Sequence, residues 1–255
     1  MPTLNRFLDA LPPAVVRAVV HRLWPRQEPE LARLDDYLIA DCTAVDVGAW
    51  WGPWTAALAR RCPRVHSFEP QPQLAARLRE WAPSHVTVHE AGVGAQAGSA
   101  RLTRPDSLPG TDGLASLRPS TGTDAVGWQR IEVDVVTLDG CGLTDVGFIK
   151  IDVEGLEQAV LVGAETIIGR DRPRLMIEIE QRHLDRPISE VFDWLIRRDY
   201  EGWFLRGGVR RSMWYRLDDF DVEADQLHHL DRVKSARYIN AFLFVPAEQG
   251  WVGPV

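Results

Sequence analysis

The sequence predicts an α/β fold with a mostly parallel central sheet, helices on both faces and an N-terminal helical extension. Short apolar strands alternate with helical segments along the middle of the chain, a glycine turn follows the first strand, and acidic residues stand at the ends of later strands. Alternating strand and helix units imply parallel strands joined by helical connections. The length of 255 residues suits one large domain of this kind or two small ones, and we expect one.

Residues 1–40 are expected to form the helical extension, and residues 41–255 the α/β domain. Valines recur at helical spacing from Val15 to Val20, and a second helix is expected over Glu30–Ile39. Buried strands are expected at Thr43–Val47, Arg64–Phe68, His85–His89, Gly147–Ile151 and Arg174–Glu180. The helices between and after them are expected at Trp54–Arg61, Pro72–Trp81, Gly155–Gly163 and Ile188–Arg198. Further β segments are expected at Ser99–Thr103, Ile131–Leu138, Gly202–Leu205, Met213–Leu217 and Ala241–Val245.

Composition excludes several classes of protein. The formal net charge is −7, from 36 acidic and 29 basic residues, whereas a protein that binds duplex nucleic acid usually carries a basic surplus. The apolar stretch Ala14–Leu23 is too short and too charged for a membrane span or a signal sequence. The 3 cysteines have no metal-ligand spacing, so neither a disulfide framework nor a zinc site is indicated. We expect a cytoplasmic protein without nucleic-acid partners.

A glycine turn joins the first buried strand to a helix. Its spacing, from Asp46 through Gly48 to Gly52, places Trp50 where a dinucleotide fold needs its middle glycine, which argues against NAD. S-adenosylmethionine has an adenosine but no pyrophosphate and makes no such demand. Glu69 ends the next strand, where an acid can accept hydrogen bonds from ribose hydroxyls. The alternative is a tight strand-to-helix turn, with Glu69 capping the following helix.

At these positions the sequence resembles the FkbM-type S-adenosylmethionine-dependent O-methyltransferases. The resemblance spans about residues 42–182 and is carried by Val45–Gly52, Phe68–Pro70, Glu90–Gly94, Val136–Asp139, Phe148–Gly155 and Glu178–Glu180. It implies a Rossmann-like class I methyltransferase fold. It also implies a cofactor site made of Asp46, Gly48, Ala49, Trp50, Gly52, Glu69, Pro70, Glu90, Ala91, Gly92 and Asp152. Trp50 and Glu90 stand where asparagine is common in the family.

Acidic residues gather where two predicted strands end. Asp152 follows one strand, and alternation places Glu178 and Glu180 on one side of the other, with His183 just beyond. Carboxylates at the end of a strand buried on both faces need partners or water. These four residues are the candidate catalytic groups, with His183 as a base or a carboxylate acting directly.

Other interpretations of the same residues stay open. A divalent ion held by Asp152 and Glu178 is a further way to acidify an alcohol, although no metal site is indicated. Glu154 fits a favourable acid in a helix's first turn, and Lys150 a neutralising partner of one of the acids. Glu180 also fits a surface residue paired with an arginine, and His183 a solvated loop residue.

The expected function is methyl transfer to a hydroxyl of a sugar or of a glycosylated or polyketide secondary metabolite. The alternatives are a nicotinamide-dependent oxidoreductase and a non-catalytic cofactor-binding protein. The partner is a small-molecule or carbohydrate acceptor, and a homo-oligomer is compatible with the sequence. Segment 104–127, rich in proline and glycine, is expected to be either a lid over the acceptor or a disordered loop. Trp50, Trp51 and Trp54, three of 10 tryptophans, are expected beside the cofactor or the acceptor.

Overall fold

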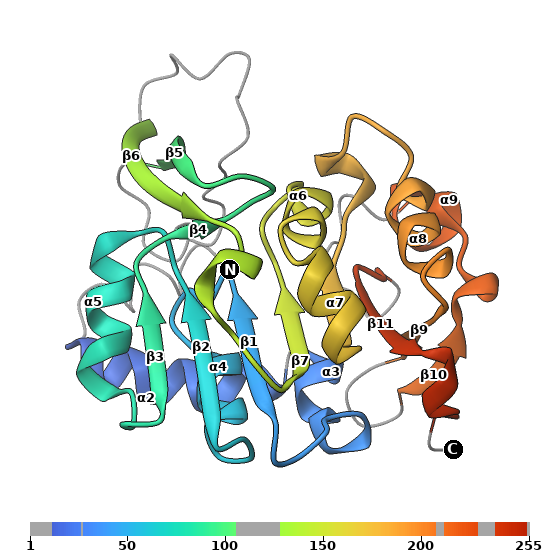
Figure 1. Ribbon diagram of the computed structural model, residues 1–255, viewed down its shortest axis with the longest axis horizontal. Helices are drawn as coiled ribbons and strands as arrows, with labels where there is room; N and C mark the ends of the chain where they lie inside the picture. The colour runs from blue at the N-terminus through green and yellow to red at the C-terminus, as the bar shows by residue number, and fades with distance from the viewer. Residues whose placement is uncertain (1–11, 27, 106–127, 208–211, 229–237, 254–255) are drawn as a thin grey trace.

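An eight-stranded sheet runs through the centre of the computed structural model (Figure 1), which describes residues 12–26, 28–105, 128–207, 212–228 and 238–253. The strand order is β10-β9-β11-β8-β7-β1-β2-β3. The strands with parallel partners are β1 (Thr43–Val47), β2 (Arg64–Phe68), β3 (Val86–His89), β7 (Val146–Ile151) and β8 (Arg174–Glu178). The remaining three pair antiparallel and are β9 (Tyr200–Arg206), β10 (Met213–Arg216) and β11 (Ala241–Pro246). The predicted α/β fold with a mostly parallel sheet is confirmed.

The direction of the strand order changes between β1 and β7. The chain lays β2 and β3 on one side of β1 and then returns to place β7 and β8 on the other side. Open α/β sheets bind ligands outside the carboxyl ends of their strands at such a switch point. Asp46 of β1 lies opposite Lys150 of β7, and the two strands end side by side. The fold therefore places the candidate site at the ends of β1 and β7.

Helices cover both faces of this sheet. The N-terminal half contributes α2 (Pro13–Leu23), α3 (Pro29–Ala32), α4 (Pro53–Leu58) and α5 (Pro72–Trp81). The C-terminal half contributes α6 (Glu157–Val162), α7 (Glu165–Asp171), α8 (Ser189–Ile196) and α9 (Val222–Asp225). The predicted extension, residues 1–40, contains α2 and, after it, the single helical turn α3.

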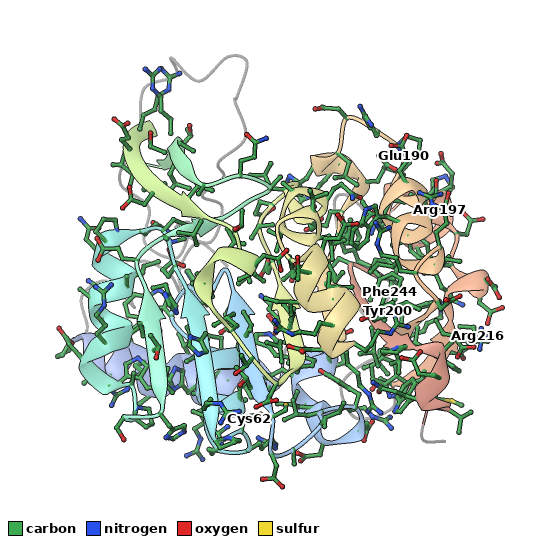
Figure 2. The ribbon with its side chains drawn as sticks, viewed as in Figure 1. Cys62, Glu190, Arg197, Tyr200, Arg216 and Phe244 are labelled. Carbon is green, nitrogen blue, oxygen red and sulfur yellow. The ribbon has the colours of Figure 1, made fainter. Side chains whose placement is uncertain are left out.

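Alternation along β7 divides the core into two layers. Phe148 packs with Leu34 and Leu58 on one face, while Ile149 packs with Leu195 on the other. In Figure 2, Glu190 of α8 and Arg197, which follows this helix, lie on the outside, whereas the buried Tyr200 and Phe244 lie in the interior. Lys150 follows Phe148 by two residues along β7, so its charged side chain lies on the same face of the sheet as the apolar layer of Phe148.

A second, three-stranded sheet lies beyond the carboxyl ends of the parallel strands (Figure 1). It contains β4 (Gly92–Val93), β5 (Gly98–Pro105) and β6 (Trp128–Val136). The long antiparallel pairing of β5 with β6 confirms the two β segments predicted in this region, although not that they form a sheet of their own. Most of the predicted lid, residues 106–127, lies outside the described residues.

The helix predicted over Glu30–Ile39 is wrong. The chain makes only α3 and a 3-10 turn over Leu34–Asp36. The hydroxyl of Tyr37 donates to the Glu30 carbonyl oxygen at 2.8 Å, and Leu31, Leu34 and Tyr37 are all buried. These three residues recur at every third position, the spacing at which a 3-10 turn aligns side chains on one side, so the apolar pattern also suits the observed turns.

Candidate functional site

Gly48 brings the ends of β1 and β7 into backbone contact. Its φ is +82°, and a Cβ at this position would lie 1.9 Å from the carbonyl oxygen of Asp152. The backbone of Asp152 occupies this space, so Gly48 is required to close the sheet edge.

The turn after β1 uses its own hydrogen-bond donors. The N–H groups of Gly48 and Ala49 both donate to the Phe68 carbonyl oxygen at 3.0 Å. The N–H of Gly52 donates to the Ala49 carbonyl oxygen at 2.8 Å. Protein oxygens therefore already accept these three N–H groups.

Glu69 joins the glycine turn to the end of β2. It is 3% exposed, and its Oε2 accepts from the N–H of Trp50 at 2.8 Å. Its Oε1 accepts from the N–H of Gln71 at 2.9 Å, just ahead of α5. Pro70 lies between the two, partly buried. The carboxylate is thus fixed at the sheet edge, and carboxylate oxygens are acceptors of the kind that suits ribose hydroxyls.

Gly52 closes the turn against a neighbouring helix. Its φ is +78°, and a Cβ there would lie 2.6 Å from side-chain atoms of both Leu78 and Trp81 in α5. The glycine therefore allows α4 to start directly beneath α5. This packing is what places Trp50 and Trp51 near α5.

Asp46 is buried at the centre of the site. Its Oδ2 accepts from the Thr55 hydroxyl at 2.6 Å, and that hydroxyl lies 2.9 Å from the Ser67 hydroxyl. Its Oδ1 has no hydrogen-bond partner among the described residues. Burial raises the pKa of Asp46, and the nearby Lys150 partly offsets this effect. An orphaned buried acceptor at this edge fits a ligand that brings its own donor, such as an ammonium group.

Lys150 and Asp152 form an ion pair at the end of β7. Lys150 Nζ lies 2.9 Å from Asp152 Oδ2, with the lysine side chain 5% exposed and the aspartate side chain 33% exposed. Burial disfavours the lysine charge, but Asp152, Asp46, Glu178 and Glu28 surround it and raise the pKa of Lys150 above its usual value. The predicted role of Lys150 as a neutralising partner agrees with this geometry.

Glu178 belongs to the same group of acids. Asn240, which precedes β11, donates through its side-chain amide to Glu178 Oε1. Burial raises the pKa of Glu178 well above its usual value, and the charges of Asp152 and Glu28 add to the shift. The structure therefore brings Asp152 and Glu178 together as predicted, in surroundings that favour the protonated form of Glu178.

A second group of polar side chains contains His183 and Glu154. His183 Nε2 lies 2.9 Å from Glu154 Oε2. This pairing with Glu154 raises the pKa of His183, while burial acts against it. Glu154 has a φ of +52°, an uncommon conformation for a residue other than glycine, and such strained residues cluster at functional sites. From the sequence we expected Glu154 only in a helix's first turn, although α6 begins later, at Glu157.

Glu180 is held beside His183 by two partners. Arg182 donates to it through Nε at 2.6 Å and through Nη2 at 3.1 Å, and the hydroxyl of Tyr238 donates to its Oε2. The expected pairing with an arginine is present, but Glu180 is 6% exposed and is no surface residue. Its Oε1 lies 3.9 Å from His183 Nε2.

The same trio has the composition of a metal-ligand set. One ligand atom each from Glu154, Glu180 and His183 lies within 4.8 Å of the others. Histidine and carboxylate ligands suit several divalent ions. The ion predicted as an alternative would use Asp152 and Glu178, which are not part of this trio.

Glu28 is a residue of this edge that sequence reasoning missed. It precedes α3, and its carboxylate accepts from the indole N–H of Trp54 at 2.8 Å and from that of Trp24. Burial raises the pKa of Glu28 to about 7. No motif marks Glu28, because it approaches Trp54 only when the extension packs on α4.

The predicted adenine contacts lie at the end of β3. Glu90 is exposed and pairs with Arg79 at 2.8 Å, whereas Ala91 and Gly92 are buried. Glu90 thus has a partner of its own and remains open to solvent. Their contact with a cofactor stays a prediction.

The sheet order, with reversed β11 next to β8 and an acid after β2, defines a Rossmann-like fold of the class I methyltransferases. The FkbM methyltransferase domain matches residues 41–201, which is more than half of the chain. The chain belongs to this family, whose methyl donor is S-adenosylmethionine. A comparison with curated proteins gives no match.

Solved structures of low sequence identity are similar to this chain. The methyltransferase FkbM from Methylobacillus flagellatus KT is 20% identical, with a TM-score of 0.49, and the match covers 80% of this chain and 43% of that one. This chain thus spans less than half the length of that protein. A putative methyltransferase from Streptococcus mutans, solved in complex with SAH, is 12% identical, with coverage of 86% and 97% and a TM-score of 0.45. An rRNA methylase from Streptococcus thermophilus is 15% identical, with coverage of 84% and 91% and a TM-score of 0.43.

No helix within the described ranges is both long enough and apolar enough to cross a bilayer. The stretch Ala14–Leu23, expected to be too short and too charged for a membrane span, lies within the 11-residue helix α2.

Proposed function

We propose that this protein is an S-adenosylmethionine-dependent O-methyltransferase that acts on a hydroxyl of a sugar or of a glycosylated or polyketide secondary metabolite. The observation that carries the proposal is the Glu154–His183 pair at the carboxyl edge of a sheet that belongs to the FkbM family. Methyl transfer to an alcohol needs a base that removes the hydroxyl proton, and this pair lies at the edge where the cofactor is predicted to bind. The family match gives no support to the nicotinamide alternative.

The cofactor supplies an electrophilic methyl group, and this chain's residues hold the two reactants. Glu69 accepts hydrogen bonds from the ribose hydroxyls of the cofactor. Asp46 and the turn Gly48–Gly52 lie along its methionine and ribose groups, and Glu90–Gly92 lie along its adenine. The orphaned Asp46 Oδ1 and the fixed carboxylate of Glu69 support this placement. Alignment of the two reactants lowers the activation barrier by several kcal/mol, about 7–11 in well-oriented cases.

His183 takes the proton of the acceptor hydroxyl. Nε2 lies 2.9 Å from Glu154 Oε2, although not in hydrogen-bond geometry. In this proposal neutral His183 carries its proton on Nε2 and accepts the hydroxyl proton at Nδ1. The Glu154 carboxylate stabilises the protonated ring. Asp152, held by Lys150, and Glu178 position the acceptor, and Glu180 supports His183 from its second side.

Binding and turnover test the proposal separately. S-adenosylhomocysteine should raise the melting temperature of the protein, because a ligand that binds only the folded state stabilises it. Methyl transfer from labelled S-adenosylmethionine should then appear with at least one member of a panel of sugars, glycosides and polyketide alcohols. The absence of any thermal shift in folded protein would reject the cofactor assignment.

Variants then test the assigned base. His183→Gln should lower turnover about 10²–10⁴-fold, as expected for loss of a general base, and leave S-adenosylhomocysteine affinity nearly unchanged. His228→Gln is the matched control, because His228 is an exposed histidine whose side chain is 70% accessible. Glu178→Gln should also lower turnover at unchanged cofactor affinity. Unchanged turnover in either test variant would remove that residue from the mechanism.

A further inference from the structure

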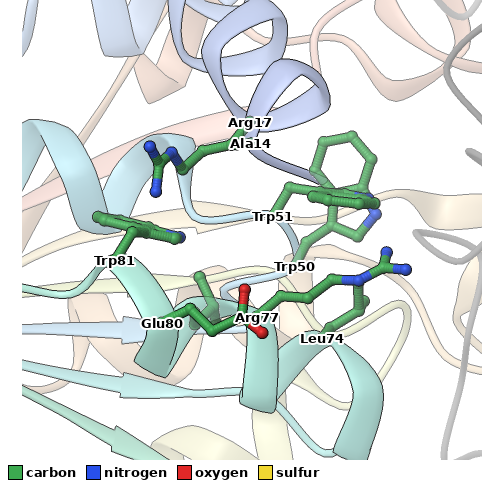
Figure 3. A pocket seen from close by; sticks show the side chains of 9 residues that line it. Ala14, Arg17, Trp50, Trp51, Leu74, Arg77, Glu80 and Trp81 are labelled. Carbon is green, nitrogen blue, oxygen red and sulfur yellow. The ribbon is translucent and has the colours of Figure 1, made fainter. Parts of the chain in front are cut away.

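A cavity lies between α2, the glycine turn and α5 (Figure 3). It encloses about 370 Å³ of space, part of which is open to solvent. Its floor is apolar, and its walls carry the residues on which the inference depends: Arg17, Trp50, Trp51, Arg77, Glu80 and Trp81. A lining of apolar surface with a few polar groups is typical of small-molecule sites.

Two arginines stand over two indole rings in this cavity. The Arg77 guanidinium lies 4.6 Å from the centre of the Trp51 ring, and that of Arg17 lies 5.9 Å from the centre of the Trp81 ring. Neither arginine forms an ion pair within the part of the chain that the structure describes. Stacking on a ring leaves the N–H edges of a guanidinium available to an anion.

The cavity adjoins the cofactor site through Trp50. The Trp50 ring lines the cavity, while its backbone N–H binds Glu69, the proposed ribose acid. The N-terminal extension supplies Arg17, so α2 completes the cavity. His21 of the same helix holds the arrangement through its Nε2, 3.1 Å from the Trp51 carbonyl oxygen, and through edge-on packing against Trp81.

We propose that this cavity binds a sugar ring that carries one acid group, a uronate or a sugar phosphate. The C–H faces of a sugar ring pack against the electron-rich faces of indoles. The guanidinium groups suit the carboxylate or phosphate, with bidentate geometry. The Glu80 carboxylate accepts from ring hydroxyls, and the two arginines with Glu80 leave one net positive charge for the ligand's acid. That this sugar belongs to the methyl acceptor rests on the proposed function.

The test measures binding to the whole chain without turnover. Tryptophan fluorescence and calorimetry follow titrations with glucuronate, glucose 1-phosphate, glucose and benzoate. Glucuronate or glucose 1-phosphate should bind at least tenfold more tightly than glucose and benzoate. Arg77→Gln and Arg17→Gln should each weaken that binding at least tenfold. Arg22→Gln, an exposed arginine of α2 outside the cavity lining, should leave it within twofold.

Each contrary outcome overturns the proposal. Equal binding of glucose shows that no acid is recognised, and tighter binding of benzoate shows that no sugar is. Competition by S-adenosylhomocysteine shows that the cavity belongs to the cofactor. Unchanged affinity in both arginine variants places the ligand elsewhere, and the titrations of the unmodified protein decide the proposal if a variant does not fold. A thermal shift with S-adenosylhomocysteine in the same protein separates failure of this inference from failure of the proposed function.

Discussion

The backbone of Gly48 meets that of Asp152 so closely that a Cβ on Gly48 would lie 1.9 Å from the Asp152 carbonyl oxygen. Gly48 directly follows β1 and Asp152 directly follows β7, and the Asp152 N–H donates to the Val47 carbonyl oxygen at 3.0 Å. The two strand ends that carry the proposed site are therefore fixed to each other by main-chain atoms. Side-chain substitutions around them leave this frame in place.

Gly48→Ala should lower the free energy of unfolding by about 2–6 kcal/mol. The positive φ costs about 1–3 kcal/mol for a residue with a Cβ, and the backbone collision adds a comparable amount. Denaturant unfolding measures the loss. Gly169→Ala is the matched control, because Gly169 lies in α7 with nothing within 4 Å of the place its Cβ would take and should gain about 0.5–1 kcal/mol. Equal effects of the two substitutions would contradict the prediction.

Glu154→Gln should move the acid limb of the turnover–pH profile to lower pH. Glu154 raises the pKa of His183, and His183 must be neutral to act as a base. Turnover of the wild type therefore falls as the pH drops through this raised pKa. Without the carboxylate the pKa of His183 decreases, so the base stays neutral to lower pH. A profile that keeps its position would show that His183 does not determine the acid limb.

Glu178→Gln should become more stable relative to the wild type as the pH rises above about 4.3, the usual pKa of a glutamate. The folded protein raises the pKa of Glu178, so the folded state keeps a proton that the unfolded chain loses. This contribution to wild-type stability is complete below the unfolded pKa and is lost as the pH rises through the folded one. Thermal unfolding between pH 4 and pH 9 measures the difference. A constant difference across this range would contradict the raised pKa.

Lys150→Met should cost about 3–5 kcal/mol of stability near neutral pH. The substitution leaves Asp46 and Asp152 at a buried edge without their cation, and breaking a buried pair costs this much. Lys150→Met combined with Asp152→Asn should recover part of the loss, which a double-mutant cycle measures. Additive losses would show that the two charges are not coupled.

Methyl transfer should persist after treatment with EDTA. Glu180 is held by Arg182 and Tyr238, and Glu154 and His183 pair with each other, so a metal ion must compete for every ligand of this trio. The measurement is the turnover rate with EDTA and after addition of Mg²⁺ or Mn²⁺. Activity that disappears with EDTA and returns with the metal ion would assign the trio to a metal centre instead.

The sequence predicted the parts of the site that depend on strand ends. A buried strand that stops at Ile151 and another that stops near Glu178 place the following acids at one edge whenever the strands are parallel. The contacts of Glu28 with Trp54 and of Glu154 with His183 depend on how separate segments pack, and no local pattern encodes them. The same limit explains the helix predicted over Glu30–Ile39, because apolar residues at every third position suit both a helix and the observed 3-10 turn.

β11 lies between β8 and β9, although it is the last of the three in the chain. Its hydrogen bonds are the ones that connect β9, and through it β10, to the parallel strands. During synthesis, residues 174–178 and 200–206 leave the ribosome before the strand that belongs between them. The sheet therefore closes only after Ala241–Pro246 has emerged, so β8 and β9 must wait for their shared neighbour with one edge each unpaired.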